Sequence, residues 1–288
     1  MTEPLPLPLK GGTKRLVITA DDFGIAVAVN EAVEQAHREG IVTAASLMVA
    51  GDAADDAVAR ARRLPALGVG LHVVLVEGRP VLPAERVPAL VDAGGRFRGD
   101  MVRVGFRIFA SRAARRQLAE EIEAQFAAFA STGLPLDHVN AHKHFHLHPV
   151  VAATILKVGR RYGMKAIRAP VEPRGLLRTI DGTRMGARIE TGWARLVRRR
   201  MRAAKIAVPD QVLGLAWSGA MNASRVRGVL EHLPAGFTEI YAHPATRPYP
   251  GSAPGYDYCG ELAALTDPMA KGLIVRDNII LGRFADFA

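Results

Sequence analysis

Short apolar runs alternate along most of this chain with segments in which apolar residues recur every three or four positions. The apolar runs predict buried strands at about 16–20, 41–49, 68–75, 136–141, 164–168 and 238–242. The segments with helical spacing predict amphipathic helices at about 25–36, 52–64, 112–129, 149–162 and 223–233, with further helix and strand at 261–284. Because strands that alternate with helices form parallel βαβ units, the pattern predicts an α/β fold.

Two regions interrupt this alternation. Residues 77–100 are rich in proline and glycine and are typical of a long excursion from the sheet. Residues 171–218 form a basic, irregular insertion, which we interpret as a lid or as a membrane-facing element. The chain has neither a GxGxxG fingerprint nor a P-loop, so a β/α barrel is favoured over a dinucleotide-binding fold. We expect an N-terminal tail at 1–13 and a single barrel domain at 14–288.

The composition fits one large domain. With 49% hydrophobic residues among 288, the chain can bury one core of barrel size. The single cysteine, Cys259, excludes a disulfide framework and a cysteine-based zinc site, and it fits a reducing cytoplasm. The N-terminus lacks the features of a signal peptide, and no uncharged apolar run approaches the roughly 18 residues that span a bilayer. We therefore expect a cytoplasmic protein.

The net charge of +10 is concentrated in two segments. Residues 103–116 hold five arginines and no acid, interleaved with Phe106 and Phe109, and residues 184–205 hold eight basic residues against one acid. Basic residues mixed with aromatic ones suit an anionic membrane or a nucleic-acid backbone, and a solvated arginine-rich face is the alternative. Since no nucleic-acid-binding signature is present, we expect no nucleic-acid partner, and we expect peripheral contact with the inner face of an anionic membrane.

The first predicted strand runs directly into two adjacent carboxylates, Asp21 and Asp22, in the sequence LVITADDFG. Neighbouring carboxylates repel each other unless a cation or a shared proton compensates their charge. A turn or a helix N-cap is the alternative explanation for such a pair. Because β/α barrels carry their catalytic residues at the carboxyl ends of strands, the pair predicts a metal site in which one Asp binds the ion and the other acts as a base.

Histidines follow two later strands. His72 lies near the end of an apolar strand, where a histidine buried in the core is the alternative interpretation. The sequence HVNAHKHFHLH places five histidines at positions of one parity, so in extended backbone they would point to one side: His138, His142, His144, His146 and His148. We expect one of them to bind a metal and the others to shape the pocket or to support the ligands, with a surface histidine tract as the alternative.

Arg168 and His243 also close apolar strands, in the sequences KAIR and EIYAH. Two histidines and a carboxylate with an open position are typical of a catalytic metal site. The chemistry that follows is metal-assisted hydrolysis, in which a free carboxylate takes a proton from water and a histidine such as His243 protonates the leaving group. The site should hold one divalent metal ion, and its ligand types favour zinc while leaving magnesium open.

The motifs TADDFG, GLH, HVNAHKHFHLHP, IRAP and YAHP occur in this order between Lys14 and about Phe284. Together they resemble the YdjC-like carbohydrate deacetylase family, which includes the chitooligosaccharide deacetylases. The segments LVEGRPVLP and LDHVNAHKH are more similar to the hopanoid-biosynthesis-associated branch of that family. The resemblance implies a distorted (β/α) barrel of the glycoside hydrolase/deacetylase type and hydrolytic removal of an N-acetyl group from an amino sugar.

The resemblance also implies roles for individual residues. Asp21 would be the base, Arg168 would orient it and His243 would be the acid. The metal ligands would be Asp22, His72 and His142, and the residues near the substrate would be His144, His146 and Phe23. The chain departs from the family pattern at Asn140, where the family often has Asp, and at Ala245, where glycine is common.

The hopanoid branch implies a lipid-linked substrate, N-acetylglucosamine carried by bacteriohopanetetrol, which would be converted to the glucosaminyl lipid. Deacetylation of soluble N-acetylated oligosaccharides such as chitobiose is the nearest alternative. More distant alternatives are a metal phosphoesterase or amidohydrolase, and a non-catalytic module that binds membranes or RNA.

Overall fold

The computed structural model describes residues 12–184 and 189–288, so nearly all of the predicted tail lies outside the described residues. The described residues form a seven-stranded sheet with strand order β4-β3-β2-β1-β6-β5 and with β7 also paired to β1. The strands are β1 (Lys14–Phe23), β2 (Ala44–Leu47), β3 (Gly68–Val73), β4 (Val139–Ala141), β5 (Gln211–Leu213), β6 (Gly236–Ala242) and β7 (Ile280–Leu281). Every pairing of these strands is parallel.

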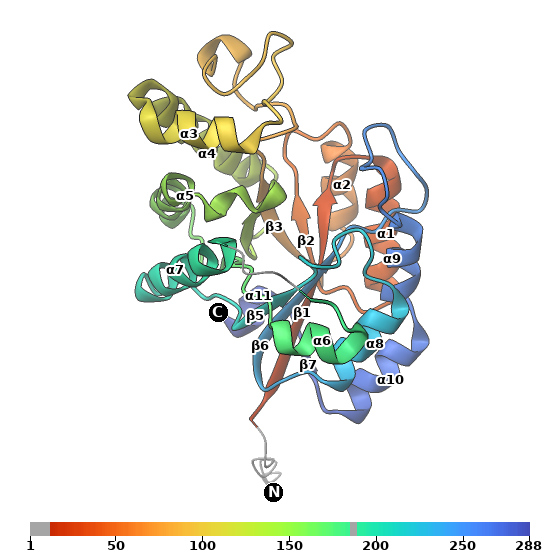
Figure 1. The fold of residues 1–288 in the computed structure, drawn as a ribbon. Coiled ribbons are helices and arrows are strands. Elements are labelled where there is room, and N and C mark those ends of the chain that lie inside the picture. Colours follow the sequence, from red (N-terminus) through yellow and green to blue (C-terminus); the bar gives the residue numbers. More distant parts are fainter. Residues whose placement is uncertain (1–11, 185–188) are drawn as a thin grey trace, which may run out of the picture.

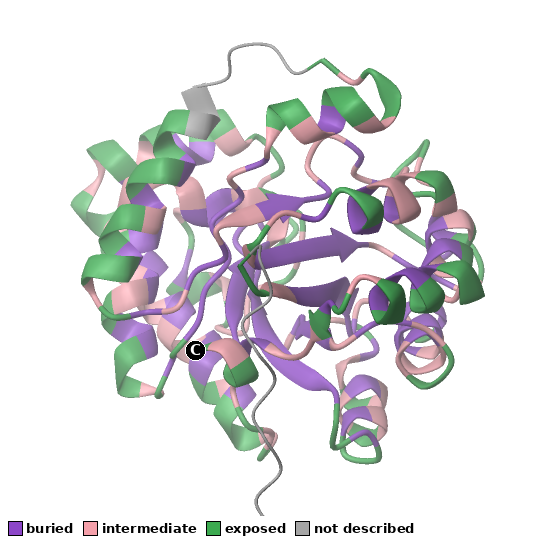
Figure 2. Ribbon diagram, turned by 90° about the horizontal axis from the view of Figure 1, so that it is seen from below, coloured by how far each residue is buried: buried purple, intermediate pink, exposed green. Residues whose placement is uncertain are grey.

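The sheet is curled and covered by helices (Figure 1). Its strands appear as a buried centre surrounded by helices whose outer faces are exposed (Figure 2). The helices are α1 (Val27–Arg38), α2 (Ala54–Ala61), α3 (Met101–Ala110), α4 (Arg112–Ser131), α5 (Pro149–Arg161), α6 (Arg174–Asp181), α7 (Ile189–Ala203), α8 (Ala223–Glu231), α9 (Tyr258–Leu265), α10 (Pro268–Arg276) and α11 (Phe284–Phe287). Two 3₁₀ helices are η1 (Ala84–Arg86) and η2 (His142–Leu147). Strands of a parallel sheet are buried on both faces, and this explains why the sequences of these strands are nearly continuous apolar runs.

The predicted strand at 164–168 is a short irregular segment that joins β4 to β5. The amide of Val139 in β4 donates to the carbonyl of Ala166, the amide of Ile167 donates to that of Ala207, and the amide of Val212 in β5 donates to that of Val171. These bonds continue the sheet across the gap between its two edge strands. The result is a half-barrel with one irregular wall, which confirms the predicted single-domain α/β fold of distorted barrel type.

The regular structure in the predicted excursion at 77–100 is limited to the short η1 and an isolated bridge between Val91 and Phe97. The prediction of an irregular insertion at 171–218 was wrong, because most of its described residues lie in α6, α7 and β5. In α7, Ala194, Val197 and Met201 are buried at helical spacing. The dense arginines between them hid this stripe in the sequence.

Helix α3 was not predicted either, because its residues were interpreted only as part of a basic segment. It packs on α4, which packs on α5, and α5 packs on α7. These helices therefore form a layer along one side of the sheet (Figure 1). Within the described residues, no helix is long and apolar enough to cross a membrane.

Candidate metal centre and active site

The two carboxylates at the end of β1 point in different directions. The register between β1 and β2 shifts between Ala20 and Phe23, as in a β-bulge, and Asp22 has a positive φ of 61°. An extra residue in one strand turns adjacent side chains away from their regular alternation. Asp21 consequently contacts Ser46 and Arg168, whereas Asp22 contacts two histidines. This local distortion lets neighbouring residues take different roles.

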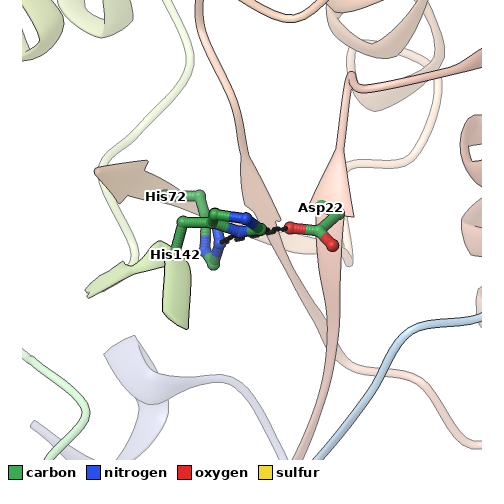
Figure 3. Close-up of side chains that lie close together, drawn as sticks. All are labelled: Asp22, His72 and His142. Atoms are coloured by element: carbon green, nitrogen blue, oxygen red, sulfur yellow. Dashed lines mark hydrogen bonds and ion pairs between the residues drawn. The ribbon is translucent and has the colours of Figure 1, made fainter. Parts of the chain in front are cut away.

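Asp22, His72 and His142 converge on one point at the carboxyl ends of β1, β3 and β4 (Figure 3). Asp22 Oδ1 lies 3.2 Å from His72 Nε2 and 3.2 Å from His142 Nδ1, and the two nitrogens are 3.4 Å apart. Ligands on bonds of about 2.1 Å around a tetrahedral ion lie about 3.4 Å from one another. The donor spacing therefore fits a divalent cation. Of the histidines in the sequence HVNAHKHFHLH, His142 is the one that lies beside Asp22 and His72.

The charges of these three groups support one another. Burial alone would raise the pKa of Asp22, but His142 and His72 hold it well below its usual range. Burial lowers the pKa of His72, yet its hydrogen bond with Asp22 and the charge of Asp21 raise it overall. Asp22 is therefore an ionised ligand at neutral pH, as binding to a cation requires.

Asn140 orients His72 from behind. His72 Nδ1 lies 2.6 Å from Asn140 Oδ1, and the Asn140 amide donates to Asp21 Oδ1 at 3.0 Å and to Ser46 Oγ at 3.1 Å. This network assigns the proton of His72 to Nδ1 and leaves the lone pair of Nε2 able to bind a metal ion. The neutral amide thus links Asp21 to His72, at the position where the family often has a carboxylate.

Replacing Asn140 by alanine should weaken metal binding by about 10- to 100-fold, because His72 loses the partner that fixes its orientation. Isothermal titration with zinc measures the change. Ser46→Ala is the matched control, since Ser46 touches Asp21 and Asn140 but neither histidine. Equal losses in both variants would argue against a specific role for Asn140.

Arg168 holds the second carboxylate. Its NH1 donates to Asp21 Oδ2 at 2.5 Å and its NH2 donates to Asp21 Oδ1 at 3.0 Å, with 0% of the Arg168 side chain and 3% of the Asp21 side chain exposed. Burial alone would raise the pKa of Asp21, but the charges of Arg168 and His72 lower it far below the usual range. Asp21 is therefore ionised throughout the neutral range, in a fixed orientation.

The other side of Arg168 contacts β6. Its Nε and NH2 donate to Glu239 Oε1 at 2.9 and 2.7 Å, and its guanidinium lies over the ring of Tyr241 at 4.3 Å. Glu239 and Tyr241 were not predicted as site residues. Together with His243 they occupy alternate positions of one strand end, so a search for polar residues with period two along EIYAH could have found them.

The prediction of an extended histidine segment was wrong. Lys143 and His144 have positive φ values of 51° and 54°, and the chain turns through η2 instead of continuing β4. His138 stays in the core, paired with Asp137 at 3.0 Å and stacked on Phe284. His138 precedes β4 and His142 directly follows it, so only His142 lies at the metal centre, and the left-handed residues Lys143 and His144 end the alternation for the histidines that follow.

His144 and His146 lie near Arg168. His144 Nε2 is 2.8 Å from the Tyr241 hydroxyl. Burial, followed by the charge of Arg168, lowers the pKa of His144 well below its usual value and that of His146 to about 3. Both rings are therefore neutral. His146 and Phe23 are fully buried. The burial favours a supporting position behind the site, and the predicted contacts of His144, His146 and Phe23 with a substrate stay predictions.

His243 follows β6 and is partly exposed, with 13% of its side chain accessible. Its amide donates to Glu261 Oε2 at 2.5 Å, and its ring lies against the rings of Tyr241 and Tyr256. Burial raises the pKa of Glu261. His243 Nδ1 is buried and faces Glu261 Oε2 at 3.9 Å, and within the described residues it makes no hydrogen bond. A ring held beside a carboxylate on its Nδ1 side can transfer a proton to a ligand through Nε2.

A hollow opens after the carboxyl ends of three neighbouring strands. Its walls come from residues directly after β1, β2 and β3, including Ile25, Met48 and Val74, and from the excursion, including Arg79 and Arg96. These residues lie close in sequence to Asp22 and His72, at the end of the sheet where β/α barrels bind their ligands. The residues that line the hollow do not include Asp21, Asp22, His72 or His142, so the hollow neighbours the site in sequence without being lined by it.

The family profile described as YdjC-like protein matches residues 15–276. The chain belongs to the YdjC-like family. The carbohydrate deacetylase of Homo sapiens is 34% identical to it over 298 residues, covering 93% of this chain and 89% of that protein. The chitooligosaccharide deacetylase of Enterobacter sp. (strain 638) is 29% identical over 278 residues, covering 95% and 99%. The carbohydrate deacetylase of Brevibacillus brevis is 39% identical over 148 residues, which cover 51% of this chain and 56% of that protein.

This YdjC-like chain also resembles a solved structure from Enterococcus faecalis V583, provisionally named a cellobiose-phosphate cleavage protein. The TM-score is 0.76 and the identity 25%, and the alignment covers 96% of this chain and 100% of that one. The similarity over both whole chains supports the distorted barrel described above.

Proposed function

We propose that this YdjC-like protein is a metal-dependent carbohydrate deacetylase that hydrolyses the N-acetyl group of an amino sugar. The observation that carries the proposal is the separation of roles at the end of β1. Asp22 belongs to a donor set that fits a divalent cation, while Asp21 is ionised and held apart from that set by Arg168. The names of its relatives, carbohydrate deacetylase and chitooligosaccharide deacetylase, support the same class of reaction.

In the proposed mechanism, Asp22, His72 and His142 hold the cation. When bound, such an ion polarises the amide carbonyl and makes a water molecule more acidic. Asp21 accepts a proton from the attacking water, and Arg168 keeps the carboxylate in place. His243 donates a proton to the amide nitrogen, because an amine leaves far more readily than its anion. The C–N bond then breaks to give acetate and the free amino sugar.

The low pKa of Asp21 makes it a weak base in the thermodynamic sense. Its contribution therefore comes from position, since a fixed and always ionised carboxylate beside the water needs no reorganisation during the reaction. Histidine and carboxylate ligands favour zinc, and a carboxylate with water ligands leaves magnesium open.

The finer proposal is that the amino sugar is lipid-linked, as N-acetylglucosaminyl bacteriohopanetetrol, and that the protein meets it at the inner face of an anionic membrane. The similarity of two short segments to the hopanoid-associated branch supports this substrate. The chitooligosaccharide deacetylase among the relatives supports a soluble substrate at least as well.

Two proposals can be tested together: the metal-dependent deacetylation and the lipid-linked substrate. The measurement is acetate release from N-acetylglucosaminyl bacteriohopanetetrol and from N,N′-diacetylchitobiose, with added zinc or magnesium. Release from either substrate by wild type, lost in Asp22→Ala, would support the metal-dependent deacetylase. Release from chitobiose alone would overturn the lipid-linked substrate and keep the reaction. No acetate from either substrate, with a metal bound, would overturn the proposed function.

A further inference from the structure

Helix α3 carries a stripe of apolar side chains on its outer face. Val102, Phe106 and Phe109 are 84%, 72% and 63% exposed, and they are three of the nine exposed large hydrophobic residues in the described ranges. Their spacing of four and three residues places them along one side of the helix. A surface helix of a globular protein normally presents polar residues there.

The opposite face of α3 is also apolar and is fixed to the rest of the protein. Val104 and Ile108 are 2% and 0% exposed. Gly105 lies against His148, since a Cβ added at Gly105 would be 3.4 Å from the imidazole. The side chain of Asp100 caps the helix by accepting from the amide of Arg103. The outer stripe is therefore presented by a well-anchored helix that is apolar on both faces.

Arginines flank the stripe without any acidic residue between 101 and 117. Arg103, Arg112 and Arg116 are exposed on α3 and on the first turns of α4. Arg103 and Arg116 have acidic neighbours only at 3.7 Å, in Asp100 and Glu120. Their side chains are 81% and 75% exposed, so these contacts leave the charges accessible to a further partner.

The helix lies toward the carboxyl ends of the strands, on the side of the molecule where the metal centre is found (Figure 1). It is joined to that region through Gly105 and His148, directly after η2. A partner bound to α3 would thus be held on the side of the molecule that carries η2 and the metal centre.

We infer that α3 docks this protein on the surface of an anionic lipid bilayer. Val102, Phe106 and Phe109 enter the boundary between headgroups and acyl chains, while Arg103, Arg112 and Arg116 meet the lipid phosphates. A nucleic-acid backbone would leave the apolar stripe in water, and a second copy of α3 would bring like charges together. The inference that α3 binds a bilayer depends only on the properties of this surface. The further step, that binding brings the protein to a lipid-linked sugar, rests on the proposed function.

Sedimentation with vesicles tests the inference. We expect the full chain to bind vesicles of equal parts phosphatidylcholine and phosphatidylglycerol, to bind pure phosphatidylcholine weakly, and to lose affinity as salt screens the arginines. The double variant Phe106→Ser/Phe109→Ser should bind at least about tenfold more weakly, because it removes two aromatic side chains from the apolar phase. Met269→Ser/Val275→Ser on α10 is the matched control, since those residues are 62% and 77% exposed.

The inference fails if both double variants bind equally well, if neutral vesicles bind as strongly as anionic ones, or if RNA is preferred to vesicles. A mass of two chains in light scattering that falls to one in Phe106→Ser/Phe109→Ser would instead assign α3 to a second copy. Circular dichroism checks the fold of each variant. Acetate release from chitobiose checks catalysis separately, so failure of the membrane inference and failure of the proposed function are distinguishable.

Discussion

Replacing Asp21 by asparagine should lower acetate release by about 10²- to 10⁴-fold, the contribution typical of a positioned acid or base. Asparagine keeps the shape of the side chain and can still bond to Ser46, but it cannot accept a proton from water. The metal donors Asp22, His72 and His142 are not replaced. We therefore expect kcat to fall while the affinity for zinc, measured by isothermal titration, changes little.

Asp22→Asn is the matched control at the neighbouring position. It should lower metal affinity together with activity, because Asp22 supplies the one carboxylate of the donor set. The assignments of the two carboxylates would have to be exchanged if Asp21→Asn lost the metal and Asp22→Asn kept it. Full activity of Asp21→Asn would remove Asp21 from the mechanism.

Replacing Arg168 by methionine should abolish detectable deacetylation and destabilise the protein by about 3–5 kcal/mol. Arg168 is fully buried between Asp21 and Glu239, whose side chains are 3% and 0% exposed. Methionine has a similar volume but leaves two buried carboxylates without their shared cation. Urea unfolding, with its linear dependence on denaturant, measures the loss of stability.

The effect of Arg168→Met should depend on pH. In wild type, the lowered pKa of Asp21 contributes stability that is fully present above the pKa of the unfolded chain and is lost as pH falls through the folded value. Without Arg168, the charge that lowers the pKa of Asp21 is gone and burial raises that pKa, so protonation of Asp21 reduces the instability of the variant at low pH. The difference in stability between wild type and variant should therefore be largest at neutral pH and smaller in acid.

The double variant Arg168→Met/Glu239→Gln separates structure from catalysis. Removing the charge of Glu239 should restore part of the lost stability, since one buried carboxylate fewer is left unpaired. Activity should not return, because Asp21 still lacks the guanidinium that orients it. A return of activity with stability would show that Arg168 acts only on the fold.

The sequence predicted those parts of the fold that depend on local pattern. The apolar runs of β1, β2, β3 and β6 and the amphipathic spacing of α1, α4, α5 and α8 identified elements with errors confined mainly to their ends. Helices α3 and α7 were not recognised, because their buried positions are separated by arginines. In α3 the outward positions are apolar as well, which removes the contrast on which helical periodicity depends.

The candidate site was predicted where polar residues end apolar strands, as at Asp22 and His72. The prediction that the histidines at alternate positions share one side was wrong, because Lys143 and His144 adopt left-handed backbone angles. Alternation along a strand gives no indication of such a turn. Glu239 was missed because its role depends on Arg168, which is 71 residues away in the chain. The alternation along EIYAH indicates that Glu239 faces the same side as His243, but its pairing with Arg168 depends on how the sheet curves and not on a local pattern.

The irregular wall between β4 and β5 couples the integrity of the barrel to the orientation of Asp21. The wall is held through backbone bonds of Ala166, Ile167 and Val171, and the side chain of Arg168 ties it to β1 and β6. Local opening of so short a segment costs less free energy than opening a central strand, and amide hydrogen exchange measures that cost. Because opening also withdraws Arg168 from Asp21, the free energy of this opening sets the fraction of molecules in which Asp21 is held in one orientation at any moment.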